Sequence, residues 1–246
     1  MPFISAGYPN LATTSALLPA LESAGASMIE IGLPFSDPIA DGPTIQESYT
    51  RALANKIKVG DCFKAVADVR SKVSIPLVAM VSFSIVYRQG LDRFLKSAKE
   101  SGIDGLILPD LPPPEADATC KKVNAAGLDT ILLIAPTTSP QRRAKVAELC
   151  TGFIYYLSIS GITGERNALP ADLAANLAAL RSVTNKPICV GFGISTAQHL
   201  GQLKGNADGA IVGSAIVKRI TQHATETPEK IAQAVGSYCR ELLAGV

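Results

Sequence analysis

The sequence has no tryptophan and only two histidines, His199 and His223, among its 246 residues. A zinc site built from three histidines is therefore impossible, and we predict no metal site. Both histidines lie in polar, helical-looking surroundings, which predicts that they are surface residues. General acid–base chemistry must then come from carboxylates, lysine, tyrosine or cysteine.

Positive charge is missing from the first fifty residues, which contain five acidic side chains before the first basic one, Arg51. A signal or transit peptide needs early positive charge, so we expect a cytoplasmic protein, or one of the plastid stroma if a transit peptide has been removed. No apolar run approaches the ~18 residues that cross a membrane. The formal net charge is only +2, which gives no sign of a nucleic-acid partner.

No two cysteines form a Cys-x-x-Cys motif, and their number, five, is odd. Widely spaced single cysteines are typical of reduced thiols in a cytosolic protein. They are Cys62, Cys120, Cys150, Cys189 and Cys239.

Short apolar runs alternate with amphipathic stretches along the whole chain. Strands that are buried on both faces need nearly continuous apolar runs, and eight segments fit: residues 3–6, 28–32, 77–81, 105–108, 130–134, 153–157, 188–191 and 210–212. Helical patterns lie between them, at residues 11–24, 91–101, 113–126, 140–149, 173–181 and 197–203, after Gly213 and at 228–243. This alternation predicts parallel strands with right-handed crossovers.

The length of 246 residues is close to the ~250 residues typical of a (β/α)8 barrel. No linker, charge block or change of composition divides the chain. We therefore predict an α/β protein, with a single (β/α)8 TIM barrel domain over residues 1–246. No Gly-x-Gly-x-x-Gly motif opens the first helix, which argues against a dinucleotide-binding fold.

One carboxylate stands inside an apolar strand, because Glu30 is flanked by Met28, Ile29 and Ile31. Burial raises the pKa of a carboxyl group, which suits a side chain that gives and takes a proton near neutral pH. A structural glutamate, held by a backbone amide or a lysine, explains this pattern equally well.

The loop after this strand contains three prolines and a glycine, and a loop of this composition loses little entropy when it is ordered. Asp37 and Asp41 lie on it, and either could cap the helix that we expect to begin near Thr44. Pro43, beside Thr44, also suits a helix start.

Glycine-rich segments follow the last three expected strands, at residues 158–164, 191–195 and 213–214. In this fold the loops after strands seven and eight, together with a helix N-terminus, form a recurrent phosphate site. Glycines that only permit tight turns are the alternative. The phosphate site predicts a small phosphorylated substrate, and proton transfer by carboxylates requires no metal or redox cofactor.

A seventeen-residue stretch resembles the signature of the tryptophan synthase alpha chain family: Glu30-Ile31-Gly32-Leu33-Pro34-Phe35-Ser36-Asp37-Pro38-Ile39-Ala40-Asp41-Gly42-Pro43-Thr44-Ile45-Gln46. Four further segments are similar to that family's other marks, in the same order: Leu108-Pro109-Asp110-Leu111-Pro112, Gly161-Ile162-Thr163-Gly164, Gly191-Phe192-Gly193-Ile194-Ser195 and Gly213-Ser214-Ala215. The resemblance covers essentially the whole chain, and the first stretch is highly specific.

The resemblance implies a lyase that splits indole-3-glycerol phosphate into indole and glyceraldehyde 3-phosphate by a retro-aldol step, as the α component of tryptophan synthase in the last step of tryptophan biosynthesis. Glu30 matches the family's acid–base residue and Asp41 its partner carboxylate. Glu30 would protonate indole C3 and then take the glycerol hydroxyl proton as the carbon–carbon bond opens. Asp41 would accept a hydrogen bond from the indole N–H.

The resemblance also implies a set of substrate-binding residues. They are Phe3 and Phe192 at the indole slot, Tyr155 as an active-site tyrosine, Thr163 on a lid that meets the loop aspartate, and Gly164, Gly193, Gly213 and Ser214 at the phosphate.

In this family the chain docks on a β chain that carries pyridoxal phosphate, and the two form an α₂β₂ heterotetramer in which indole passes through a tunnel. No cofactor is expected in this chain itself. The positions that would face the partner are Pro34, Asp37, Asp110 and Pro112.

Two features depart from the family. After the third expected strand the family has a tyrosine followed by an asparagine, whereas this chain has Ser82 and Ser84. In the family that pair makes polar contacts, some of which support the loop at residues 33–43. We do not expect the same contacts in this chain. The chain also starts within its first expected strand, so we expect a barrel without the N-terminal helix of the family.

Three alternative functions fit the same sequence. A free-standing lyase would release indole without a β partner and would keep both carboxylates. A non-catalytic activator would only bind and gate a β chain, which the presence of both carboxylates disfavours. Another phosphosugar barrel, an isomerase or a synthase, would use different catalytic residues.

Overall fold

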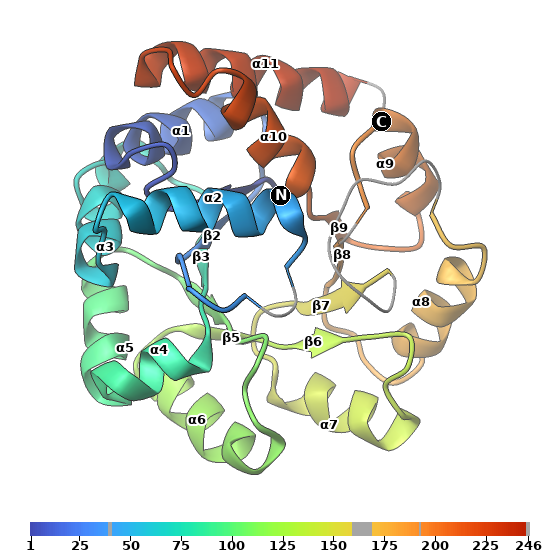
Figure 1. Ribbon diagram of the computed structural model, residues 1–246. Helices are drawn as coiled ribbons and strands as arrows, with labels where there is room; N and C mark the ends of the chain where they lie inside the picture. The colour runs from blue at the N-terminus through green and yellow to red at the C-terminus, as the bar shows by residue number, and fades with distance from the viewer. Residues whose placement is uncertain (39–40, 159–168, 192, 245–246) are drawn as a thin grey trace.

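The computed structural model describes residues 1–38, 41–158, 169–191 and 193–244. In these residues parallel strands form the centre of the molecule and helices surround them (Figure 1). The first sheet contains, in order, β1 (Phe3–Ser5), β2 (Ile29–Gly32), β3 (Leu77–Met80), β4 (Gly105–Ile107) and β5 (Asp129–Ile131). The second contains β6 (Leu133–Ile134), β7 (Ile154–Leu157), β8 (Ile188–Gly191) and β9 (Gly209–Ala210).

Backbone hydrogen bonds join the two sheets into a closed barrel. β5 and β6 follow each other directly and share one strand position, and the intervening Leu132 carbonyl accepts a hydrogen bond from the Tyr155 N–H at 3.1 Å. On the other side, the Phe3 N–H donates to the Val212 carbonyl at 2.9 Å, and the Val212 N–H donates to the Met1 carbonyl at 2.9 Å. The predicted (β/α)8 barrel is therefore confirmed, with the fifth expected strand divided at Leu132.

The helices form the outer layer of the barrel, and α11 returns to pack against α1 (Figure 1). None of the helices in the described residues has both the length and the apolar character needed to cross a membrane. Their bounds are α1 (Leu11–Ser23), α2 (Pro43–Ala54), α3 (Val59–Ala67), α4 (Phe83–Gln89), α5 (Leu91–Glu100), α6 (Pro113–Ala125), α7 (Pro140–Leu149), α8 (Leu173–Arg181), α9 (Ala197–Leu203), α10 (Ser214–Gln222) and α11 (Pro228–Ala244). The sequence pattern did not predict α3 or α4.

Side-chain caps fix where several helices begin. The Asn10 side chain accepts the Thr13 N–H at the start of α1, at 2.9 Å. The Thr196 hydroxyl accepts the His199 N–H at the start of α9, at 3.2 Å. Each cap satisfies a backbone N–H that has no partner within its own helix. Gly102 follows α5 with a φ of 88°, a backbone conformation that side chains with a Cβ rarely adopt and that ends the helix.

Alternate residues of each strand point into the barrel or out towards the helices. Glu30 pairs with Phe3 of β1 and Val78 of β3, so these three side chains share the interior. Ile29 and Ile31 belong to the apolar core between the strands and the helices. The rest of the interior is mainly apolar: its buried cluster contains Val78, Ile107, Ile131, Phe153, Tyr155 and Ile211.

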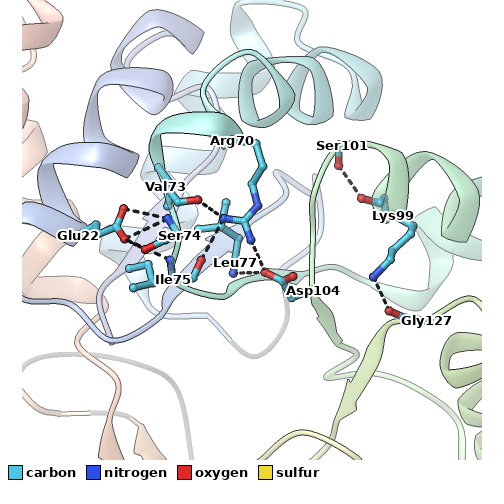
Figure 2. Close-up of polar contacts among 11 residues, drawn as sticks. Glu22, Arg70, Val73, Ser74, Ile75, Leu77, Lys99, Ser101, Asp104 and Gly127 are labelled. Carbon is cyan, nitrogen blue, oxygen red and sulfur yellow. Dashed lines mark hydrogen bonds and ion pairs between the residues drawn. The ribbon is translucent and has the colours of Figure 1, made fainter.

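An arginine and an aspartate tie together the loops at the N-terminal ends of β3 and β4 (Figure 2). The Arg70 guanidinium donates to the Val73 carbonyl at 2.5 Å and to the Asp104 carboxylate at 3.0 Å. The same carboxylate accepts the Leu77 N–H at the start of β3, at 2.8 Å. This network holds the end of the barrel opposite to the loops that carry Asp41.

The same arrangement recurs at β8 and β9. The Arg181 guanidinium donates to the Lys186 carbonyl at 2.9 Å and to the Asp208 carboxylate. That carboxylate accepts the Ile188 N–H at the start of β8, at 2.8 Å. The N-terminal ends of both sheets are thus anchored in the same way.

The prediction that His199 is a surface residue is wrong. Its side chain is only 2 % exposed, and its Nδ1 accepts the Ser195 N–H at 3.3 Å, so it ties the loop after β8 to α9. His223 follows α10, is partly exposed and contacts the Glu226 carboxylate at 2.7 Å. All five cysteines are free, as expected.

Candidate active site

Glu30 is sealed inside the barrel. Its side chain is 0 % exposed, and neither carboxylate oxygen has a hydrogen-bond partner among the described residues. Burial and then the charge on Asp41 raise the pKa of Glu30 to about 8, although the N-terminal ammonium group acts in the opposite direction. Glu30 is therefore protonated at neutral pH, and no lysine or backbone amide in the described residues holds it as a structural ion. The described residues therefore give no support to the alternative of a structural, hydrogen-bonded glutamate.

Asp41 lies at the C-terminal end of the loop between β2 and α2. Burial raises its pKa to about 6, so it is mostly ionised at neutral pH. The N-cap of α2 is Gly42, Pro43 is the first helical residue, and no side chain makes a capping hydrogen bond there. The hypothesis that Asp37 or Asp41 caps this helix is therefore wrong, and the Asp37 carboxylate instead accepts the Ser36 hydroxyl at 2.6 Å.

The loop that carries Asp41 is held by its own helix. The Gln46 side-chain amide donates to the Asp41 carbonyl at 2.7 Å and to the Pro38 carbonyl at 3.3 Å. At the start of the loop the Leu33 N–H donates to the Met80 carbonyl at 2.9 Å. Gln46 thus supports the loop through contacts that do not involve Ser82 or Ser84.

A cavity of about 370 Å³ opens where the loops after β2, β3 and β4 meet. Asp41, Tyr49, Ser82 and Asp110 are among the residues that line it. Glu30 is not among the residues that line this cavity. Its charge nevertheless raises the pKa of two buried tyrosines, Tyr49 and Tyr155. The arrangement places an ionised carboxylate beside the cavity and a protonated one in the barrel interior.

Two tyrosines lie over glycines at the C-terminal ends of β2 and β8. A Cβ added to Gly32 would lie 2.3 Å from the Tyr49 hydroxyl oxygen, and one added to Gly191 would lie 2.5 Å from the Tyr155 hydroxyl oxygen. Burial and then the charges on Glu30 and Asp41 raise the pKa of Tyr155 well above its usual range. Both phenols therefore keep their protons beside the two carboxylates.

Phe3 connects the carboxylates to the expected phosphate end of the site. Its ring would lie 2.5 Å from a Cβ at Gly32, and its Cβ 3.8 Å from one at Gly213. Gly213 is the N-cap of α10, which begins at Ser214, and the first amides of a helix have no partners within it. Gly193, with a φ of 80°, lies in the neighbouring loop after β8.

The four positions expected to face a partner chain lie on the loops after β2 and β4. Asp110 accepts the Ser82 hydroxyl at 2.6 Å and the Phe83 N–H at 2.7 Å, so it links the loop after β4 to the start of α4. Pro112 is the N-cap of α6 and Pro34 is half-buried in the loop after β2. Asp37 is exposed on the same loop.

Three of the expected site residues, Thr163, Gly164 and Phe192, lie outside the described residues. In the described residues no group of three or more histidine, cysteine, aspartate or glutamate side chains is arranged to hold a metal ion. Sequence reasoning did not single out Tyr49, although the buried face of α2 contains it at one helical turn from Ile45.

Replacing Gly32 with Ala is expected to destabilise the protein by about 1–3 kcal/mol, the usual cost of adding a methyl group to a packed interior. The new Cβ would lie 2.3 Å from the Tyr49 hydroxyl oxygen and 2.5 Å from Cζ of Phe3. Both rings are buried, so neither can move without displacing its neighbours. Denaturant titration measures the change.

The matched control is Gly201→Ala in α9, where the added Cβ would have no atom within 4 Å. Alanine is favoured over glycine in a helix, so this variant should be as stable as the wild type or more stable by up to about 1 kcal/mol. Equal stability of the wild type and the Gly32→Ala variant would contradict the close packing at Gly32.

Relatives of the chain share its sequence over almost its full length. A sequence model of the tryptophan synthase alpha chain family matches residues 1–246. The tryptophan synthase alpha chain of Synechocystis sp. is 43% identical over 243 residues, which cover 98% of this chain and 91% of the relative. That of Chloroflexus aurantiacus is 43% identical over 247 residues, which cover 100% of this chain and 92% of the relative.

Solved structures agree with these relatives. A mutant tryptophan synthase alpha-subunit from the hyperthermophile Pyrococcus furiosus superposes with a TM-score of 0.90 at 36% identity, over 99% of this chain and 96% of the other. A structure from Aquifex aeolicus gives a TM-score of 0.89 at 33% identity, over 100% of this chain and 91% of the other. The family model, the identity with these relatives and the shared barrel lead to one conclusion: the chain belongs to the tryptophan synthase alpha chain family.

Proposed function

We propose that Glu30 and Asp41 carry the cleavage of indole-3-glycerol phosphate into indole and glyceraldehyde 3-phosphate in this chain. As a member of its family the chain is a carbon–carbon lyase of tryptophan biosynthesis and needs no cofactor of its own, because pyridoxal phosphate belongs to the β chain. The observation that carries the proposal is the pair of carboxylates in opposite states: Glu30 has a pKa of about 8 and Asp41 of about 6. At pH 7 one can donate a proton while the other is charged.

The reaction needs a proton at indole C3 and a base at the glycerol hydroxyl. Protonated Glu30 gives its proton to C3, which produces an indolenine with positive charge at the ring nitrogen. The resulting Glu30 carboxylate then takes the proton of the hydroxyl on the carbon attached to C3. The C–C bond breaks, its electrons return to the ring as indole forms, and the carbon that bore the hydroxyl becomes the aldehyde. Glu30 ends protonated, as it began.

Asp41 stabilises the charge that develops during this step. Its carboxylate accepts the indole N–H, so its negative charge lies next to the nitrogen that becomes positive. Burial makes this interaction stronger than it would be in water. The cavity that Asp41 lines opens at the C-terminal ends of the strands, where barrels of this fold bind their substrates.

The phosphate is expected at the N-terminus of α10. Its first amides, at Ser214 and Ala215, have no partner within the helix and can bind an anion, and Gly213 and Gly193 allow the phosphate to come close to the backbone. Phe3 spans the distance between this end and Gly32, so it would lie against the indole. Tyr155 would lie at the same interior face as Glu30.

We further propose that a tryptophan synthase β chain docks on the rim that contains Pro34, Asp37, Asp110 and Pro112, in an α₂β₂ heterotetramer in the cytoplasm. An exposed aromatic side chain supports this surface, because Tyr87 on α4 is 79 % exposed and its ring centroid lies 6.4 Å from that of Phe83. Asp110 fixes the start of the same helix. Large exposed aromatic side chains are enriched in protein interfaces.

We also propose that residues 1–246 act as one domain. Support comes from two hydrogen bonds, from the Phe3 N–H to the Val212 carbonyl and from the Val212 N–H to the Met1 carbonyl, which join the start of the chain to the segment after β9.

The test is indole formation by the purified chain, alone and with a β chain. The proposal expects slow cleavage by the chain alone and a strong rise when the β chain is added. A rate that is already high and that the β chain does not change would favour the free-standing lyase. No cleavage under either condition, with a β chain that is nevertheless stimulated, would favour the non-catalytic activator.

A further inference from the structure

Tyr49 brings a second polar group into the interior beside the carboxylates. It lies on α2, its side chain is 3 % exposed, and its hydroxyl lies over Gly32. Gly32 and Glu30 are two residues apart on β2, so both face the same side of the strand. The Tyr49 hydroxyl therefore lies on the interior side of β2, nearer than Glu30 to the mouth of the barrel.

The hydroxyl of Tyr49 is available as a donor. No hydrogen bond to it occurs among the described residues, whereas buried tyrosine hydroxyls usually have a partner. It differs from the sealed oxygens of Glu30, because Tyr49 lines the cavity. Burial, then the charges on Asp41 and Glu30, raise its pKa well above the usual range, so the phenol keeps its proton at neutral pH.

Among the described residues, the Asp41 carboxylate has no hydrogen-bond donor. Its loop is held through the backbone by Gln46, but no side chain or amide in the described residues donates to its carboxylate. Asp41 lines the same cavity as Tyr49 and is the charge that acts most strongly on the Tyr49 hydroxyl. A carboxylate that binds a ring N–H with one oxygen needs its other oxygen fixed for the orientation to be maintained.

We propose that Tyr49 is a positioning residue for Asp41: in the substrate complex its hydroxyl donates to one carboxylate oxygen of Asp41 and leaves the other for the indole N–H. This inference rests on the proposed function of Asp41. Tyr49 itself takes and gives no proton in the reaction. Its contribution is to hold Asp41 charged and correctly turned towards the ring nitrogen.

The first test is Tyr49→Phe, assayed for cleavage of indole-3-glycerol phosphate with the β chain present. It should lower kcat/KM by about tenfold or more, the factor expected when a hydrogen bond to a charged group is lost. The matched control is Tyr156→Phe. Tyr156 is also fully buried and its hydroxyl also has no partner in the described residues, but its side chain belongs to the core between strands and helices. This control should stay within about twofold of the wild type in kcat/KM.

A double-mutant cycle separates positioning of Asp41 from any independent role. If Tyr49 acts through Asp41, Tyr49→Phe should cause no further loss, within about twofold, when it is added to Asp41→Asn. Losses that multiply, or a Tyr49→Phe variant with wild-type kcat/KM, would overturn the inference. A fall in the thermal midpoint of Tyr49→Phe without any kinetic change would do the same, because it would show a purely structural role.

Ligand binding tests the inference without turnover. Indole and benzothiophene have nearly the same shape, but only indole has an N–H, so calorimetry with both measures the contribution of the Asp41 acceptor. Tyr49→Phe should weaken indole binding by about tenfold and leave benzothiophene binding unchanged. Equal weakening of both ligands would overturn the inference. Failure of the wild type to cleave the substrate would instead contradict the proposed function, and the ligand comparison would still decide the role of Tyr49.

Discussion

Replacing Glu30 with Gln is expected to reduce indole formation to below about a hundredth of the wild-type rate, because general acid–base catalysis by a positioned side chain contributes about 10²–10⁴-fold. Glutamine keeps the size of the side chain but can neither donate a proton to indole C3 nor accept one from the hydroxyl. The measurement is indole release from indole-3-glycerol phosphate with a β chain present. Residual activity above about a hundredth would contradict the acid–base role.

The matched control for this variant is Glu47→Gln, the same chemical change on α2. Glu47 is exposed and forms a surface pair with Arg51 at 2.5 Å, and such pairs contribute little. The control should retain wild-type activity. Binding of a phosphate ligand should also survive Glu30→Gln, because the phosphate is expected at Gly213 and Ser214. Loss of phosphate binding together with activity would indicate a structural defect in place of a lost proton transfer.

The same variant has a readout that does not depend on turnover. The pKa of Glu30 rises from an ordinary value of 4.5 in the unfolded chain to about 8 in the folded protein. The folded state therefore binds more protons between these two pH values, and the free energy of unfolding falls as the pH rises through this range. Glu30→Gln should remove this loss. Its stability relative to the wild type should grow from pH 4.5 to pH 8 and reach on the order of a few kcal/mol.

The barrel could be predicted from the sequence because its strands are buried on both faces. Such strands leave continuous apolar runs, and the run around Glu30 is continuous except for the carboxylate itself. The division of the fifth strand at Leu132 could not be predicted in the same way, because it depends on pairing with β4 on one side and β7 on the other. Pairing partners are distant in sequence and leave no local pattern.

Individual side chains in the site were less predictable. His199 has polar neighbours in sequence, yet the face of α9 that carries it packs inwards. Asp37 and Asp41 were the expected helix caps, and only the backbone geometry decides that Gly42 takes this position. A sequence shows which residue types are present near a helix start, whereas the cap depends on the angle at which the loop enters the helix.

Tyr49 shows most clearly what the sequence leaves out. Its spacing from Ile45 predicts that it faces the core, and a buried tyrosine in a helix is usually a packing residue. Its position beside Asp41 is seen only in the folded chain, where both residues line the same cavity. The glycine that makes room for its hydroxyl, Gly32, is on a different element. Neither the sequence of α2 nor that of β2 shows that these residues contact each other.

The pH dependence of kcat/KM should be bell-shaped, with its maximum between about pH 6 and pH 8. Catalysis needs Asp41 ionised and Glu30 protonated, and burial places their pKa values at about 6 and about 8. Below the first value protonation of Asp41 removes the acceptor for the indole N–H. Above the second value Glu30 has lost the proton that C3 requires. Each limb should fall about tenfold per pH unit, and kcat/KM reports these groups in the free enzyme.

Asp41→Asn separates the two limbs. It should abolish the acidic limb, because asparagine does not titrate, and lower the overall rate. It should also move the alkaline limb to lower pH, since the negative charge of Asp41 contributes to the high pKa of Glu30. The two carboxyl groups interact, so the limbs of the wild type belong to the pair as a whole. An alkaline limb that stays in place in this variant would mean that burial alone sets the proton affinity of Glu30. A profile that is flat from pH 5 to pH 9 in the wild type would contradict both assigned roles.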